Sequence, residues 1–367
     1  MKRHSCSRGP AVAITTAGVV VVALATAFST ASAVQAAQVR GNVNRWRLDY
    51  VWSRTEGQFY AVASSGPKDA WAVGITGPAA NPKGPLAAHW NGRSWRTVSV
   101  PGSKGLIFDQ VAESSAKNVW VVGEPTKPNV NSTAFVYNGK HWHTIALPIG
   151  PVLQLLVLGP SDVWVANDNY CSSYSCTENI YHWNGTTWQS DPLTTYLNAL
   201  TATSDSNLWA VGFSAIPSGY LTAYRWSGTQ WVARSIPRVL GADFLGAAAW
   251  RSEVWISSVT TNGRDTYVLR KNTRSWTKLT APGSVPAFAA PVADGHGGVW
   301  LGSQAHWTGR KWLAEWLPST FTEGWTGVNA AFVKVPGTTD SYWSLGYNQT
   351  SSRAATRPAV AVFGPVP

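Results

Sequence analysis

Two short stretches, Asp69-Ala-Trp-Ala-Val-Gly74 and His89-Trp-Asn-Gly-Arg-Ser-Trp95, recur along this chain of 367 residues. The tryptophan of the first stretch returns, 43 to 49 residues apart, at Trp71, Trp120, Trp164, Trp209, Trp255, Trp300 and Trp343. Counterparts of the second stretch begin at Tyr137, His182, Trp226 and His306. Self-similarity at this spacing indicates a fold built from repeated supersecondary units.

Each repeat contains four short runs that suit β-strands. Phe59-Tyr-Ala-Val-Ala63 is the first run, and a Gly-Pro-Lys-Asp turn leads from it into the tryptophan strand. The His-Trp run is third, and Asn-Gly turns the chain tightly into a fourth strand. Four antiparallel strands in about 45 residues are typical of a propeller blade. The sequence therefore predicts an all-β fold, a seven-bladed β-propeller with four antiparallel strands per blade.

The two ends of the repeat array predict how the ring closes. The seventh repeat has a second strand at Tyr342-Trp343 and a third at residues 359–363, but no fourth. Residues 44–51, ahead of the first blade, match the fourth strand of blade one. We expect this N-terminal strand to complete blade seven, so that the ring has no free edge. The propeller is expected to span residues 44–364.

The N-terminus has the pattern of an export signal. Lys2, Arg3 and Arg8 precede an apolar stretch at residues 11–28, and Ala31-Ser32-Ala33 is a small-residue cleavage site. We predict a secretory signal peptide over residues 1–33, cut between 33 and 38, and a secreted, extracellular protein. An uncleaved membrane anchor is the alternative, which the small residues disfavour. After cleavage we expect no stable membrane insertion.

Charge and cysteine content agree with export. The formal net charge is +11, yet only 13% of residues are charged and the basic ones are scattered. This indicates mild attraction to anionic polymers such as those of cell walls, and no nucleic-acid partner. Cys171 and Cys176 lie in a polar loop, where we predict a disulfide. Half of a metal site is the alternative, but no second Cys/His pair stands near, so we predict no metal and no cofactor.

Ligand-binding candidates are sought among residues that the repeat does not explain. Most of the 22 tryptophans recur at strand positions that pack blade against blade. Trp52, Trp316 and Trp325 do not, and they fall near connections of blades six, seven and one. Hypothetically they form an aromatic patch that stacks on sugar rings, although they could instead pack the blade junctions. A long loop in blade three supplies further candidates, Asp168, Tyr170 and Tyr174.

No residue is assigned a catalytic function. His89, His182 and His306 share one repeat position and are interpreted as packed or bonded to a turn. Asp294-Gly-His-Gly-Gly298 is interpreted as a glycine-rich turn, with a calcium loop as the alternative. A glycosidase needs two facing carboxylates. Six acids are candidates by location alone: Asp49, Asp109, Asp168, Asp191, Asp243 and Glu323.

The repeats resemble those of secreted bacterial propellers that carry Ser-x-x-Asp-Val-Trp-Ala-Val-Gly followed by His-Trp-Asn-Gly-x-x-Trp. Such propellers are common among exported proteins of Gram-positive actinobacteria. Blade six, from Asp294 to Gly302, is also similar to a repeat of regulator-type sensor propellers. Kelch and galactose-oxidase-like propellers are similar in outline, but the double-glycine kelch motif is absent. The resemblance implies a recognition or scaffold role, and no catalytic residue is carried over.

The sequence thus favours a secreted, non-catalytic binding propeller for cell-wall or extracellular polysaccharide. One alternative is a carbohydrate-active hydrolase or lyase on the same fold, because propellers can place acids around their axis without a sequence signal. The other is an extracellular protein-interaction scaffold.

Overall fold

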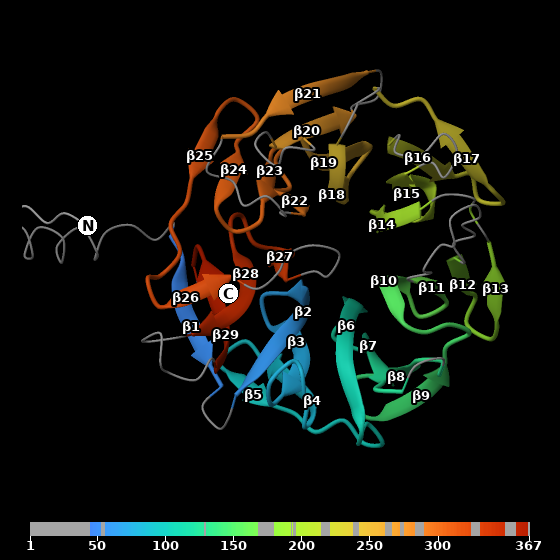
Figure 1. Cartoon of the computed structure of the whole chain (residues 1–367), viewed down its shortest axis with the longest axis vertical. Coiled ribbons are helices and arrows are strands. Elements are labelled where there is room, and N and C mark those ends of the chain that lie inside the picture. The colour runs from blue at the N-terminus through green and yellow to red at the C-terminus, as the bar shows by residue number, and fades with distance from the viewer. Residues whose placement is uncertain are drawn as a thin grey trace, which may run out of the picture. The chain divides into compact units, whose positions relative to one another are not determined.

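The computed structural model describes residues 45–52, 56–127, 130–167, 180–191, 193, 196–213, 221–237, 242–260, 266–271, 275–282, 290–323, 331–348 and 357–365. All of them belong to one compact unit, Asn44–Pro367. Within this unit the described residues form 29 strands in seven antiparallel sheets, arranged as a ring (Figure 1). The chain is a seven-bladed β-propeller, which confirms the predicted fold.

In blades 1 to 6, four consecutive strands pair in chain order from the inner edge of the ring to its rim. Blade 1 contains β2 (Gly57–Gly66), β3 (Asp69–Thr76), β4 (Gly84–Trp90) and β5 (Trp95–Thr97). Blade 2 contains β6 (Leu106–Ser115), β7 (Asn118–Pro125), β8 (Thr133–Tyr137) and β9 (Trp142–Ala146). Blade 3 contains β10 (Val152–Gly159), β11 (Asp162–Asn167), β12 (Ile180–Trp183) and β13 (Trp188–Ser190).

The next three blades repeat this order. Blade 4 contains β14 (Tyr196–Ala202), a 3-10 turn η1 (Asp205–Asn207), β15 (Leu208–Phe213), β16 (Leu221–Trp226) and β17 (Trp231–Arg234). Blade 5 contains β18 (Ala242–Trp250), β19 (Glu253–Thr260), β20 (Thr266–Lys271) and β21 (Trp276–Thr280). Blade 6 contains β22 (Pro291–Ala293), β23 (Val299–Leu301), β24 (Ala305–Trp307) and β25 (Trp312–Ala314). No helix in the described part of the chain is long and apolar enough to cross a membrane.

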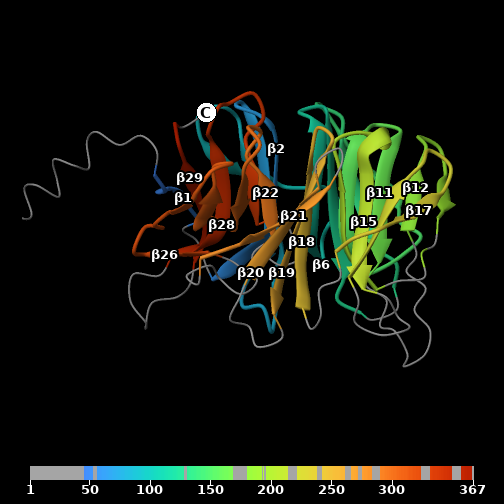
Figure 2. The same cartoon turned by 90° about the horizontal axis from the view of Figure 1, so that it is seen from above.

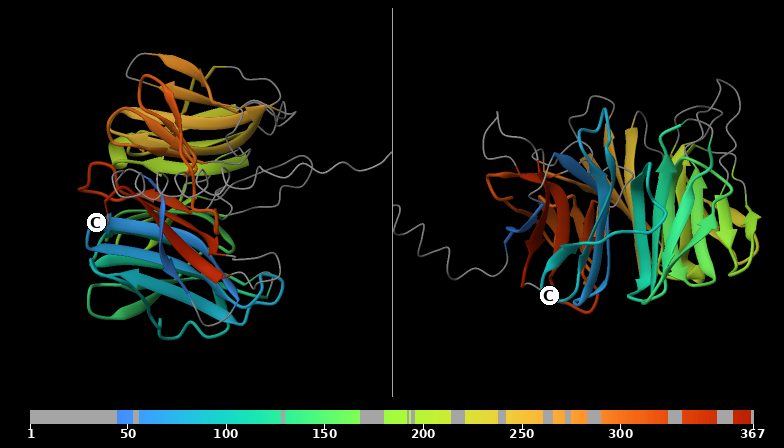
Figure 3. Two further views of the ribbon diagram at one scale, coloured as in Figure 1. Left: turned by 90° about the vertical axis from the view of Figure 1, so that its left-hand side faces the viewer. Right: turned by 90° about the horizontal axis from the view of Figure 1, so that it is seen from below.

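Blade 7 joins the two ends of the propeller. Two pieces, β26 (Phe321–Glu323) and β27 (Phe332–Lys334), form its inner strand and pair with β28 (Tyr342–Asn348). Next comes β29 (Arg357–Phe363), and β1 (Arg47–Val51) pairs antiparallel with it, which confirms the predicted closure. Figure 3 shows the blue N-terminal strand beside the red strands of this blade. Inner strands of neighbouring blades contact each other all round the ring, including β2 with β27, and β2 also contacts the second strand β28.

A β-bulge at the same level of several inner strands explains the glycine that ends the tryptophan motif. The register shifts between Phe59 and Ala61 in blade 1, directly opposite Gly74. A Cβ on Gly74 would lie 2.0 Å from the carbonyl oxygen of Gln58, so the bulged strand leaves no room for any side chain. Blades 2 and 4 repeat the shift opposite a glycine of the same motif. In blade 7 the gap between β26 and β27 falls at the same level of β28.

Substitution of Gly74 by Ala should therefore lower the free energy of unfolding by about 2 kcal/mol or more, because backbone and not a flexible side chain blocks the new methyl group. Gly66→Ala is the matched control in β2, the neighbouring strand of the same blade. A Cβ there would meet nothing closer than 4.0 Å, so stability should change by less than about 1 kcal/mol. Urea unfolding of both variants measures the difference, and equal losses would contradict the close-approach argument.

The tryptophan of each second strand packs against the blade that follows it in the ring. Edge-to-face contacts, with ring centroids 5.2 to 6.5 Å apart, join Trp71 to Trp142, Trp120 to Trp188, Trp164 to Trp231, Trp209 to Trp276, Trp300 to Trp46, and Trp343 to Trp95. In the remaining junction, Trp255 shares a hydrophobic cluster with Trp312. Each partner stands at the fourth-strand position of the next blade, so a single aromatic contact is repeated around the whole ring.

Trp46 supplies this contact for the closing strand. Its side chain is buried among Trp300, Phe332 and Phe363, and its indole N–H donates a 2.6 Å hydrogen bond to the carbonyl oxygen of Ser303. The residue just before β1 thus fixes the N-terminal segment to the last two blades.

Replacement of Trp46 by Ala should destabilise the propeller by about 3–5 kcal/mol, the usual cost of emptying a large aromatic site in a core. The control is Trp316→Ala, which removes a tryptophan that is 85% exposed and should leave stability within about 0.5 kcal/mol of wild type. Thermal unfolding would reveal the contrast. A Trp46→Ala protein as stable as Trp316→Ala would mean that closure does not depend on this packing.

Candidate functional site

A carboxylate at the turn before the second strand pairs with a third-strand histidine in blades 1, 3 and 6. The Nε2–O distances are 2.7 Å for His89 with Asp69, 2.9 Å for His182 with Asp162, and 3.0 Å for His306 with Asp294. Each imidazole also stacks on the second-strand tryptophan of its own blade, with ring centroids 4.1 to 4.4 Å apart. The interpretation of these histidines as packed and turn-bonded is confirmed.

Other blades fill the same position with different chemistry. In blade 5, Arg270 donates to Glu253 at 2.6 Å and lies over the ring of Trp255. In blades 2 and 4, an asparagine accepts the indole N–H of the second-strand tryptophan. The position therefore connects a turn to the second and third strands, whichever polar residue occupies it, and its recurrence reflects architecture.

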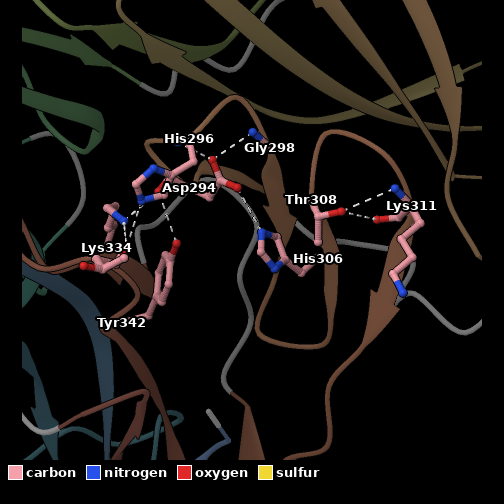
Figure 4. Close-up of polar contacts among 9 residues, drawn as sticks. Asp294, His296, Gly298, His306, Thr308, Lys311, Lys334 and Tyr342 are labelled. Carbon is pink, nitrogen blue, oxygen red and sulfur yellow. Dashed lines mark hydrogen bonds and ion pairs between the residues drawn. The ribbon is translucent and has the colours of Figure 1, made fainter. Parts of the chain in front are cut away.

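The glycine-rich segment of blade 6 shows how tightly such a carboxylate can be held. Asp294 accepts the backbone N–H groups of His296 and Gly298 at 2.7 and 2.8 Å, as well as the imidazole of His306 (Figure 4). Burial alone would raise the pKa of Asp294, but these hydrogen bonds outweigh it and hold the pKa below its usual range. The segment is the glycine-rich turn that the sequence predicted, closed by its own aspartate.

A buried carboxyl group with no cationic partner among the described residues lies between blades 1 and 2. Glu113 of β6 approaches Asp69 and Ser65 of blade 1. Burial, followed by the proximity and negative charge of the Asp69 carboxylate, raises the pKa of Glu113 to about 10. Hydrogen bonds, from His89 foremost, lower the pKa of Asp69 despite its burial. Near neutral pH, Glu113 therefore holds a proton and Asp69 carries the charge.

This arrangement predicts a pH dependence of stability. The folded protein keeps the Glu113 proton between pH 4.5, the ordinary value for glutamate, and about 10, whereas the unfolded chain releases it. The free energy of unfolding should consequently fall as pH rises through this window, by up to about 1.4 kcal/mol per pH unit. Glu113→Gln should remove that slope. Denaturant unfolding between pH 5 and 9 tests this, and parallel curves for the two proteins would contradict it.

A cavity of about 380 Å³ lies between blades 3 and 4. The described residues that line it are Asp162, Trp164, His182, Gln189 and Asp191 of blade 3 and Trp226, Gly228 and Thr229 of blade 4. They come from β11 and β12, from β13 and the residue after it, and from β16 with its turn into β17. The two blades lie side by side in Figures 1 and 2. None of these residues belongs to the inner strands β10 and β14, so the cavity lies toward the rim, away from the axis.

The aromatic walls of the cavity are held rigidly. Trp164 stacks on His182 with an interplanar angle of 10°, and Trp226 meets its edge at a centroid distance of 5.0 Å. The indole N–H of Trp164 donates to Asp162, which also accepts a hydrogen bond from His182. Trp226 is 8% exposed, so only the small part of its indole that borders the cavity is accessible, and Trp164 is fully buried. Packing and hydrogen bonds thus set the shape of the cavity before any ligand arrives.

The polar wall of the cavity is not repeated in blades 1 and 6, the two other blades that have the third-strand histidine. Strand register places Gln189 where blade 1 has Arg96 and blade 6 has Leu313. Two residues further along the fourth strand, Asp191 stands where blade 1 has Val98 and blade 6 has Glu315, each donating its backbone N–H to the third strand. Burial raises the pKa of Asp191, and the adjacent His182 opposes that shift.

The structure separates the residues proposed from sequence as an aromatic patch. Trp52 is 8% exposed and packs in a cluster with Trp90 and Trp343, so it offers little surface for stacking on a ligand. Trp316 is 85% exposed in the connection between β25 and β26. Trp325 lies outside the described residues, as do Asp168, Tyr170, Tyr174 and the predicted Cys171–Cys176 disulfide. The patch itself stays a prediction.

The cavity was not among the predicted sites, because most of its residues belong to the repeat itself. Trp164, His182 and Trp226 look like packing residues, and only the polar pair on the fourth strand departs from the other blades. Asp191 was one of six acids singled out by location. Comparison of fourth strands across the blades could have identified it, since Val98 shows an apolar residue at that position.

The sequence matches no family model and no curated protein. Solved propellers are similar in structure at low identity. One is a YCF48 structure bound to a D1 peptide, at 14% identity with a TM-score of 0.55, covering 88% of this chain and 97% of that one. This likeness supports the fold alone. Two lectins have lower TM-scores. They are a SapL1 lectin in complex with alpha methyl fucoside (14% identity, TM-score 0.46, covering 72% and 98%) and an Aleuria aurantia lectin in complex with Fucalpha1-6GlcNAc (14%, 0.47, 85% and 98%).

Proposed function

We propose that this protein is an exported carbohydrate-binding propeller, and that the cavity between blades 3 and 4 is its sugar-binding site. The observation that carries the proposal is the composition of that cavity. It combines the accessible part of the Trp226 indole with an amide, a hydroxyl and two carboxylates, Asp162 and Asp191, in about 380 Å³. Small-molecule sites in proteins occupy about 300–1,000 Å³ and share this mixture of apolar walls and a few placed polar groups.

The chemistry of a sugar ring fits these walls. A pyranose has an apolar C–H face, which packs well on an aromatic ring, and a rim of hydroxyl groups that need hydrogen-bond partners. Trp226 supplies the aromatic surface. Gln189, Thr229 and Asp191 supply donors and acceptors around it. The Thr229 hydroxyl lies 3.4 Å from that of Ser227 in the same turn, whereas Gln189 and Asp191 have no side-chain hydrogen bond within the described residues. A sugar that binds Gln189 and Asp191 would therefore not have to break protein contacts.

The charge of the cavity argues against an acidic ligand at this site. The described residues that line it include two aspartates and no lysine or arginine. The general basic excess of the chain can attract anionic polymers over a distance, but a uronic acid or phosphate group would meet like charge here. Neutral or positively charged sugars of a cell-wall or extracellular polysaccharide are thus the better ligands for the cavity. Export through the predicted signal peptide would bring the protein to such polymers.

The test is to close the cavity without disturbing the core. Thr229 lies on the exposed turn between β16 and β17, so Thr229→Trp should block the mouth and leave the melting temperature unchanged. Binding to the polysaccharides that retain the wild-type protein, measured by affinity electrophoresis or a glycan array, should fall at least about tenfold.

Lys140→Trp is the matched control, because Lys140 is exposed at the same place in the corresponding turn of blade 2. It should bind like wild type. Loss of binding in both variants, or in neither, would refute the assignment of the site. Release of reducing ends from a retained polysaccharide would establish the hydrolase alternative instead.

A further inference from the structure

Asp191 is the residue of the cavity whose charge is not committed to the protein. The carboxylate of Asp162 already accepts from the indole of Trp164 and the imidazole of His182. Asp191, half-buried on the same wall, has no side-chain hydrogen bond within the described residues. Burial of a carboxylate without such partners is costly, and this cost appears as a raised pKa. A cation bound beside Asp191 would relieve it.

The other junctions show that this charge is a local feature. Blade 1 has Val98 at the position of Asp191, and blade 2 has Lys140 where the turn of blade 4 has Thr229. Between blades 3 and 4 the acid is present and the facing turn offers Thr229, so the basic residue is missing. This junction therefore combines an acid with a neutral facing turn.

The junction between blades 6 and 7 has an acid at the same position but differs in its facing side chains. Glu315 stands where blade 3 has Asp191. At the positions of Trp226 and Trp231, blade 7 carries Phe363 and Trp46, and the indole N–H of Trp46 donates to the carbonyl oxygen of Ser303. An acid at this position thus does not define the cavity by itself. The cavity is defined by Asp191 together with Gln189 and the turn of blade 4.

We propose that the cavity between blades 3 and 4 selects a sugar that carries a free, positively charged amino group, with Asp191 as the anchor of that group. This rests on the proposed carbohydrate-binding function and adds the class of sugar. The ammonium group would donate charge-assisted hydrogen bonds to the Asp191 carboxylate. The same cation is attracted to a nearby indole, and Trp226 lines the same cavity. Gln189 and Thr229 remain for the hydroxyl groups.

A sugar ammonium group fits this site better than a metal ion. Within the described residues, no group of three or more His, Cys, Asp or Glu side chains is arranged to hold a metal. One uncommitted carboxylate beside an indole is a complement for a singly charged amine. N-acetylation would remove both the charge and two of the three ammonium protons, so the acetylated sugar should lose the contact with Asp191.

The test compares three β-1,4-linked oligosaccharides of equal length that differ only at C2: glucosamine, N-acetylglucosamine and glucose oligomers. Calorimetric titration of the purified wild-type protein near neutral pH should give at least about tenfold tighter binding of the glucosamine oligomer. Asp191→Asn keeps the shape and removes the charge. It should bring the glucosamine oligomer to the affinity of the other two and leave those unchanged. Glu315→Gln, the same position in blade 6, is the control and should keep the preference.

The outcomes separate this inference from the proposed function. Equal binding of all three oligomers, unaltered in Asp191→Asn, would leave a sugar-binding cavity and overturn the selection of an amino group. Loss of the preference in Glu315→Gln but not in Asp191→Asn would overturn the assignment to this cavity. Absence of binding to any oligomer by the wild-type protein, together with a negative glycan array, would overturn the carbohydrate function itself.

Discussion

The edge-to-face contact between one blade's second-strand tryptophan and the next blade's fourth-strand tryptophan is the interaction on which this ring depends. It recurs at six of the seven junctions, and the seventh places the same two positions in one cluster. A blade has apolar residues on both faces and cannot bury them alone, so its stability comes from its two neighbours. The contact also has a direction. The second-strand tryptophan of each blade contacts the blade that follows it in the ring, and its fourth-strand tryptophan contacts the blade that precedes it. A strand added from the chain's other end can complete the circle only if it brings the fourth-strand ring, and Trp46 does so.

The same contact makes the candidate site possible. A small cavity can remain open beside a rigid wall, but it collapses where neighbouring side chains are free to repack. Trp164 is fixed by stacking on His182 and by edge-to-face contacts with Trp226 and Trp231. The structural residues of the junction therefore hold the cavity open, and two fourth-strand side chains make it polar. Four side chains of the cavity, Gln189, Asp191, Trp226 and Thr229, differ from those at the same positions between blades 1 and 2, and the fold is the same at both junctions.

Carboxyl groups buried between blades are stabilised in two different ways, by an imidazole partner or by retention of the proton. In blades 1, 3 and 6 the turn carboxylate is matched by an imidazole, and the pKa values of Asp69 and Asp294 stay low because the charged form is hydrogen-bonded. Glu113 has no such partner, and its proton stays on because Asp69 already carries the charge. Asp191 is intermediate: half-buried, near one imidazole, and open to the cavity. That difference in environment, rather than residue type, separates a structural carboxylate from one that can meet a ligand.

The sequence by itself determined the number of blades, their strand order and the closing strand, because each depends on local patterns that recur at a fixed spacing. It also predicted that His89, His182 and His306 are structural, since a residue that recurs with the repeat serves the repeat. Only the tertiary structure decided which side chains meet across a junction. Trp52 proved to be buried while Trp316 is exposed, although both follow a fourth strand, because burial depends on what the neighbouring blade places there. The cavity likewise arises from residues nearly 70 positions apart, Asp162 and Thr229, whose contact depends on how two independently patterned sheets pack together.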